Sequence, residues 1–122
     1  MGEEENHLTL EDEFVRSWDN EEEFFAWIRK GATWTDQAGR FIRELREAGY
    51  DRKLRAGQSL DMFIVSRSRQ HGLRRGQPRV VFRFRGTVMD MMSGEETISG
   101  IEVSLSPVVE AVLASLLEHP ID

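Results

Sequence analysis

The chain of 122 residues contains no cysteine. This absence excludes disulfides, thiolate nucleophiles and every zinc site that needs a cysteine ligand. Long apolar runs are missing as well: the longest mostly apolar stretch, residues 108–117, contains Glu110 and is too short to span a bilayer. The chain opens with acidic residues instead of the basic start and apolar stretch of a signal peptide. We therefore expect a cytoplasmic location and no membrane partner.

Signatures of catalysis and of cofactor binding are also missing. The three histidines, His7, His71 and His119, include no pair at metal-ligand spacing. The glycines form neither a phosphate-binding loop nor a dinucleotide fingerprint. Most carboxylates come in runs typical of a solvated face, and only Asp61 and Asp90 have apolar neighbours that could raise a pKa for acid catalysis. We expect no cofactor, no metal and no enzymatic activity, with a small enzyme using a carboxylate or histidine site as a second alternative.

The charge that is present is sorted into blocks. Residues 1–23 hold ten acids and one arginine, a charge of −9, and residues 86–122 carry −7. Between them, residues 40–85 hold thirteen basic residues and four acids, a charge of +9. Residues 1–7 have no apolar periodicity and are predicted to be a disordered acidic leader, followed by a single domain over residues 8–122.

Four segments have features of helices. Residues 20–30 carry acids in the first turn and end at a glycine, and residues 34–48 repeat apolar residues at helical spacing. Residues 107–118 begin with proline and carry an apolar stripe. Residues 59–71 suit a buried strand as well as a helix, and capping residues at both ends favour the helix.

The pattern changes to a period of two near the middle of the chain. From Arg79, apolar residues alternate with arginine, which predicts a strand with one wet face. A turn around 93–96 separates the two arms of an antiparallel hairpin, about 79–92 and 97–105. A short alternation near 8–10 suggests a third strand. The sequence therefore predicts an α+β fold in which about four helices pack on one face of a small antiparallel sheet.

The central block predicts a basic surface. If the third predicted helix leads through a short loop into the hairpin, cations of the helix end, the loop and the wet strand face fall on one side. These candidate binding residues are Arg67, Arg69, His71, Arg74, Arg75, Arg79, Arg83 and Arg85. A solvated surface neutralised by the chain's own acids is the plainer interpretation of the same residues.

Two binding functions remain open. The first is a non-enzymatic interaction or regulatory module that uses the Arg-rich surface for a protein partner or for self-association, with Trp18, Trp27 and Trp34 as anchors. The alternative is nucleic-acid binding through residues 67–85, because helix, helix, helix and hairpin is the element order of a winged helix. Against the alternative, residues 50–58 make a longer connection than a helix-turn-helix uses.

Overall fold

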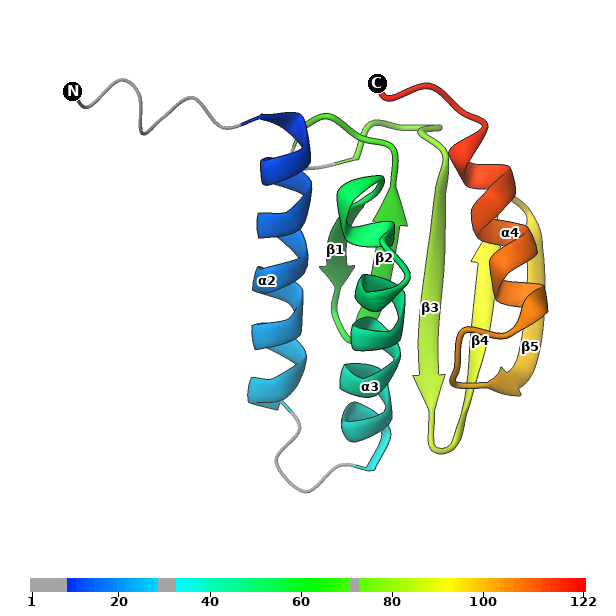
Figure 1. Ribbon diagram of the computed structural model, residues 1–122. Coiled ribbons are helices and arrows are strands. Elements are labelled where there is room, and N and C mark those ends of the chain that lie inside the picture. The colour runs from blue at the N-terminus through cyan, green and yellow to red at the C-terminus, as the bar shows by residue number, and fades with distance from the viewer. Residues whose placement is uncertain (1–8, 29–32, 71–72) are drawn as a thin grey trace.

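The computed structural model describes residues 9–28, 33–70 and 73–122, and Figure 1 shows how its elements are arranged. Five strands form one antiparallel sheet of order β1-β2-β3-β4-β5, which confirms the α+β class. The predicted leader, residues 1–7, lies outside the described residues, as does His71. In chain order the elements are α2 (Leu10–Ile28), α3 (Thr33–Glu47), η1 (Tyr50–Arg52), β1 (Arg55–Ser59), β2 (Met62–Ser66), β3 (Arg79–Arg85), β4 (Val88–Ser93), β5 (Glu96–Glu102) and α4 (Pro107–Leu117).

Helix α2 begins at Leu10, about three turns before the helix that the sequence predicts over 20–30. Thr9 and Asp12 start it by reciprocal capping. The backbone N–H of Asp12 donates to Thr9 Oγ1 at 3.0 Å, and the backbone N–H of Thr9 donates to Asp12 Oδ2 at 3.3 Å. The predicted strand near 8–10 is therefore wrong at its described residues, because its alternation belongs to the start of a helix.

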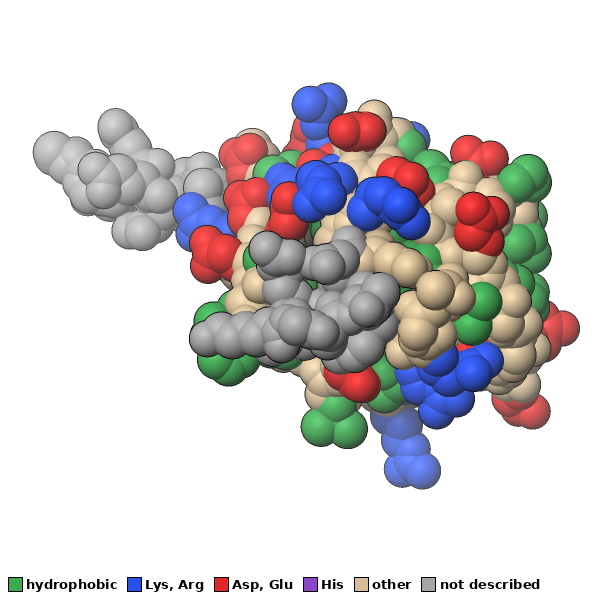
Figure 2. Space-filling view, turned by 90° about the horizontal axis from the view of Figure 1, so that it is seen from below, with side chains coloured by type: hydrophobic (Ala, Val, Ile, Leu, Met, Phe, Trp, Pro, Cys, Tyr) green, Lys and Arg blue, Asp and Glu red, His purple; other side chains and the backbone are tan. Residues whose placement is uncertain are grey.

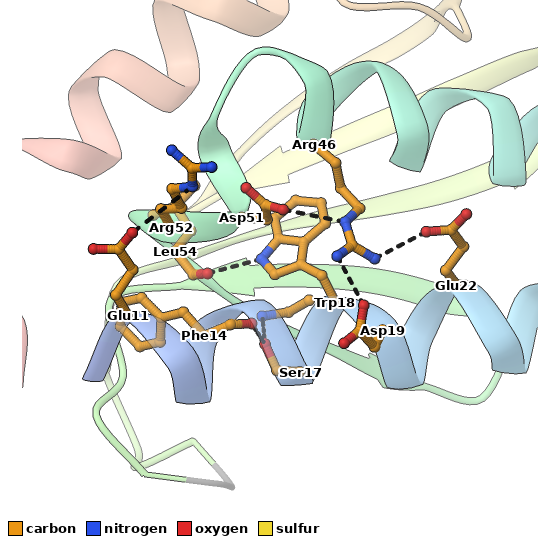
Figure 3. Close-up of polar contacts among 11 residues, drawn as sticks. Glu11, Phe14, Ser17, Trp18, Asp19, Glu22, Arg46, Asp51, Arg52 and Leu54 are labelled. Carbon is orange, nitrogen blue, oxygen red and sulfur yellow. Dashed lines mark hydrogen bonds and ion pairs between the residues drawn. The ribbon is translucent and has the colours of Figure 1, made fainter. Parts of the chain in front are cut away.

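Two buried polar contacts fix α2 against the edge of the sheet (Figure 3). Trp18, which is fully buried, donates from its indole Nε1 to the backbone oxygen of Leu54 at 2.8 Å. Ser17 Oγ accepts from the backbone N–H of Ala56 at 2.9 Å, which satisfies a donor of the edge strand β1. Trp18, which the sequence offered as one of three possible anchors for a partner, is thus a core residue.

The predicted helix over 59–71 is wrong, because this segment holds part of the hairpin β1–β2. The two strands join at a two-residue turn, where Leu60 adopts a left-handed φ of 56° and its side chain is 83% exposed. Phe63 and Val65 are buried on one face of β2, while the side chains between them lie on the other face. The turn contains neither an Asn-Gly nor an Asp-Gly pair, either of which would have indicated a hairpin. The apolar run of β2 by itself fits a helix as well as a strand.

Strand β3 pairs with two neighbours, and the predicted arm over 79–92 is in fact two strands. A turn at Gly86, whose φ is 62°, reverses the chain between β3 and β4. The predicted turn around 93–96 is confirmed and joins β4 to β5. The sheet therefore has five strands where the sequence indicated two or three, because the tight turns at Leu60 and at Gly86 were missed.

The three α-helices lie on the same side of the sheet (Figure 1), as the sequence predicts. Helices α3 and α4 have almost their predicted bounds, 34–48 and 107–118. Their apolar side chains meet the inner face of the sheet, where the fully buried rings of Phe41 and Phe82 pack edge to face with centroids 5.0 Å apart. Other members of this buried cluster include Phe25, Ile42, Leu45, Phe63, Val80, Met89, Val109 and Leu113.

The opposite face of the sheet carries no helix among the described residues (Figure 1). Ile64, Val81 and Met92 form a half-buried apolar row across this outer face, because the register places Val81 opposite both of the others. The loop between β2 and β3 rises at one end of the same face. Within the described part of the chain, no helix is long and apolar enough to cross a membrane.

Candidate binding surface beside the β2–β3 loop

Strand β3 places arginine side chains on the outer face of the sheet. The predicted wet face is confirmed, because its three arginines are exposed and the apolar residues between them are buried or half-buried. Two of these arginines lie beside the turn into β4, and the third lies at the other end of the strand, next to the β2–β3 loop. In chain order they are Arg79, Arg83 and Arg85.

Arg83 and Arg85 converge on the carboxylate of Asp90, which is 3% exposed and lies opposite Arg83 in the register. Arg85 donates from Nε to Oδ2 at 2.8 Å and from Nη2 to Oδ1 at 2.9 Å. Arg83 Nη2 donates to Oδ2 at 2.9 Å, and the backbone N–H of Gly100 donates to Oδ1 at 3.1 Å. The hydrogen bonds from Arg85 and then from Arg83 hold the pKa of Asp90 well below its ordinary value.

A carboxyl group that acts as a general acid near neutral pH needs a raised pKa, and Asp90, which the sequence named as a possible case, does not have one. Asp61 lies exposed in the turn between β1 and β2, on a different strand pair from Asp90. No group of three or more potential metal ligands occurs within residues 9–28, 33–70 and 73–122. The acidic residues singled out by the sequence therefore form no shared site.

Arg67 and Arg74 hold the C-terminal segment in place. Arg67 donates from Nε to the backbone oxygen of His119 at 2.8 Å and from Nη1 to that of Lys53 at 2.7 Å. Arg74 pairs through Nη2 with Asp122 Oδ2. Figure 1 shows the tail after α4 running back toward the β2–β3 loop, as these contacts require. Both arginines therefore have partners in the C-terminal segment.

Arg69, Arg75 and Arg79 have exposed guanidinium groups that make no hydrogen bond or ion pair within the described residues. We call these three residues the loop arginines. Arg69 and Arg75 lie in the β2–β3 loop, and Arg79 begins β3 where the loop ends. Of the eight predicted binding residues, these three make no such bond, four others are bonded to carboxylates or to backbone carbonyl oxygens, and His71 is outside the described residues.

Two grooves adjoin the loop arginines Arg79 and Arg69, and Leu73 lines both of them. The first has a volume of about 320 Å³ and lies between Leu73 and the outer face of β1, β2 and β3. Ile64 supplies its apolar floor, Ser59 and Ser66 supply hydroxyls, and Arg79 supplies a cation. The arrangement combines apolar surface with a few polar groups, as binding sites for small or extended ligands do.

The second groove has a volume of about 410 Å³ and is more polar. Arg69 and Arg74 line it together with Gln77, which is buried, and with Asp122. The backbone around it is well fixed, because Arg55 donates to the carbonyl oxygens of Ser68 at 3.1 Å and of Arg69 at 2.6 Å. Leu73 belongs to both linings, so one partner could occupy both grooves.

Elsewhere on the molecule some charges are paired, and others, such as exposed Arg40 of α3, make no ion pair within the described residues. Arg46 of α3 binds three carboxylates, those of Asp19 at 2.8 Å, Glu22 at 2.9 Å and Asp51 at 3.2 Å (Figure 3). In the view of Figure 2, acidic and basic side chains are interspersed among the coloured residues. Seen from this end, the described surface has no large field of one sign.

A third groove, of about 370 Å³, lies between α2 and β1 and contains a partly buried carboxyl group. Glu21 Oε1 is buried and has no hydrogen-bond partner within the described residues. Burial raises the pKa of Glu21 to about 7, so the group titrates near neutral pH. Glu13, Arg16 and Arg55 also line this groove.

The sequence identified the arginines but missed the grooves. Leu73 and Ile64 carry no chemical signature, and Ser59 was interpreted as a helix cap because residues 59–71 were predicted to be helical. The corrected order of elements is two helices, a five-stranded meander and a third helix, so the winged-helix order is absent from the described chain. Recognition of the β1–β2 turn at Leu60 would have revealed both facts.

Comparisons with family models, with curated proteins and with solved structures find no match for this chain.

Proposed function

We propose that this protein is a non-enzymatic interaction module that binds an acidic segment of a partner protein at the two grooves beside Leu73. The observation that carries the proposal is the free guanidinium of Arg79 at a groove whose floor is the apolar side chain of Ile64. A free cation beside apolar surface suits a peptide in which acidic and apolar side chains are mixed.

A protein partner fits this surface better than a nucleic acid does. The whole chain carries a net charge of −6, which weakens attraction to a polyanion at long range. Single-stranded nucleic acids are commonly bound by aromatic residues on an open sheet face. The aromatic residues of β3, Phe82 and Phe84, are buried on the inner face beneath the helices and cannot stack on a ligand at the outer face.

The test is a fluorescence anisotropy titration with three labelled probes: a peptide of alternating Glu and Leu, duplex DNA and single-stranded RNA. We expect the peptide to bind most tightly and its affinity to fall when salt is raised, because exposed charges contribute to the contact. Arg79→Glu should abolish peptide binding. The matched control is Arg40→Glu, which makes the same change at an exposed position on the helical side, and it should retain binding.

Two results would contradict the proposal. Tighter binding of DNA or RNA than of the peptide, with steep salt dependence and loss in Arg79→Glu, would favour the nucleic-acid alternative. Equal losses in Arg79→Glu and Arg40→Glu would show that the peptide responds to overall charge and not to this surface.

A further inference from the structure

The protein already holds one acidic residue at the edge of the second groove. Asp122 donates its backbone N–H to the carbonyl oxygen of Arg67 at 2.9 Å, and its own carbonyl oxygen accepts from the backbone N–H of Arg69 at 2.8 Å. Both bonds flank Ser68, which is the hydrogen-bond pattern of a parallel β-pair. The backbone of residues 67–69 therefore accepts an extended segment as a neighbouring strand does.

The side chain of Asp122 makes its own contact, in addition to the backbone hydrogen bonds. The carboxylate of Asp122 pairs with the guanidinium of Arg74, and Gln77 Nε2 lies 3.4 Å from the Asp122 carbonyl oxygen. We call residues 67–69 with Arg74 and Gln77 the acidic-residue seat. Backbone bonds select an extended chain, and the guanidinium selects a carboxylate at one position along it.

The seat is rigid and has room beside it. Arg67 is bonded to the carbonyl oxygens of Lys53 and His119, and Arg55 is bonded to those of Ser68 and Arg69, so four carbonyl groups around the seat are fixed. The groove of about 410 Å³ is lined by both Asp122 and Arg69. A second carboxylate of the same extended segment would meet Arg69 there.

The side-chain ion pair with Asp122 is weak enough to be exchanged. The side chains of Arg74 and Asp122 are 66% and 53% exposed, and exposed ion pairs contribute little to stability. A partner segment with more than one acidic residue gains the contact with Arg69 that Asp122 alone does not make. Charge complementarity and the free volume therefore both favour an acidic, extended occupant from outside.

We propose that the acidic-residue seat is where an extended acidic segment of the partner protein binds, and that Asp122 occupies the seat in the free protein and competes with that segment. This inference rests on the proposed function and adds the backbone geometry of recognition and a competitor within the chain. It makes Arg74 a residue that determines specificity for a carboxylate.

The experiment measures the affinity of labelled poly-L-glutamate for the full-length chain by fluorescence anisotropy. Asp122→Ala should tighten binding by about two- to five-fold, which is the range that an exposed ion pair supports. Adding Arg74→Gln to Asp122→Ala should cancel this gain, because the freed guanidinium is then missing. Glu118→Ala is the matched control, since it removes an exposed carboxylate nearby on the chain that does not enter the seat.

The outcomes separate this inference from the proposed function. Unchanged affinity in Asp122→Ala, or an equal gain in Glu118→Ala, overturns the competition, while loss of wild-type binding in Arg79→Glu would still support the function. Absence of binding to every variant overturns both. Asp122→Asn, which keeps the shape of the side chain, should reproduce the gain, and circular dichroism should show the same folded signal for all variants.

Discussion

Arg79 and Arg83 share one strand and one face of the sheet, yet only Arg83 is paired. The register of β3 with its neighbours explains the difference. Arg83 lies opposite Asp90 of β4, whereas Arg79 lies opposite Ser66 of β2. A cross-strand carboxylate thus neutralises one arginine and leaves the other free for a ligand. The comparison shows that the count of basic residues in a segment does not predict its free charge.

The largest expected effect on stability comes from removing Arg46, the arginine that binds three carboxylates. Arg46→Ala should lower the free energy of unfolding by about 2–3 kcal/mol, because the half-buried guanidinium joins α3 to carboxylates of α2 and η1. Urea denaturation followed by circular dichroism measures this change. A loss below about 0.5 kcal/mol would mean that these ion pairs, like many on protein surfaces, contribute nothing measurable.

A smaller effect is expected at the paired arginines of the sheet. Asp90→Ala should lower the free energy of unfolding by about 1–2 kcal/mol at neutral pH, because it removes an acceptor of four hydrogen bonds. The pKa of Asp90 is lowered in the folded state, so its contribution is present above its ordinary pKa and is lost as pH falls below that value. The difference between wild type and Asp90→Ala should therefore shrink in acid. A difference that is constant down to pH 2 would contradict this account.

Removing the partner of Arg83 and Arg85 tests directly whether free charge is enough for binding. Asp90→Ala leaves the side chains of Arg83 and Arg85 as free as that of Arg79. We expect this variant to bind poly-L-glutamate more tightly than wild type does, in a titration at low salt. Unchanged binding would show that the grooves beside Leu73, and not free charge alone, decide where an acidic segment binds.

A still smaller effect concerns Glu21, a carboxyl group without an arginine partner. Burial raises its pKa from 4.5 to about 7, so the folded protein binds more protons than the unfolded chain between these values. Stability from this group falls as pH rises from about 4.5 to about 7. Because the carboxyl is only partly buried, Glu21→Gln should stabilise the protein by no more than about 1 kcal/mol at pH 8 and should have less effect at pH 5. Thermal unfolding at both pH values checks this, and an equal effect at both would contradict it.

The smallest expected effect on stability is at Arg79, the unpaired arginine of the comparison. Arg79→Ala should change the free energy of unfolding by less than about 0.5 kcal/mol, because the side chain is exposed and makes no ion pair within the described residues. The same variant should bind an acidic peptide more weakly than wild type. Chemical denaturation and anisotropy on one sample distinguish the two effects, and a large loss of stability would assign Arg79 a structural role.

The predictable parts of the fold have strong periodicity or clear end signals. Helix α4 starts at Pro107 and was predicted with nearly correct bounds, and the alternation of arginine with apolar residues predicted the start of β3 but not its end at Arg85. Residues 59–71 were mispredicted because four consecutive apolar residues fit either period, and the turn at Leu60 has no glycine or asparagine. Tertiary pairing with β3, which the local sequence does not contain, decides in favour of the strand.

The candidate surface was predictable only in its composition. The sequence indicated that arginines gather in the centre of the chain, and seven of the eight candidate residues lie within the described part. Which of them stay free depends on the cross-strand register that brings Asp90 to Arg83 and Arg85, and on Asp122, which is far along the chain from Arg74. Leu73 defines both grooves, yet a single leucine in a polar loop gives no signal of its position in three dimensions.

The most direct test of the central claim is an NMR titration of the ¹⁵N-labelled protein with poly-L-glutamate, which reports on every backbone amide. We predict chemical-shift changes at residues 67–79 and at the neighbouring amides of β1 and β2, with little change around Arg83, Arg85 and Asp90. Changes centred on the paired arginines, or spread evenly over all basic residues, would contradict the claim that the free loop arginines and their grooves form the binding surface.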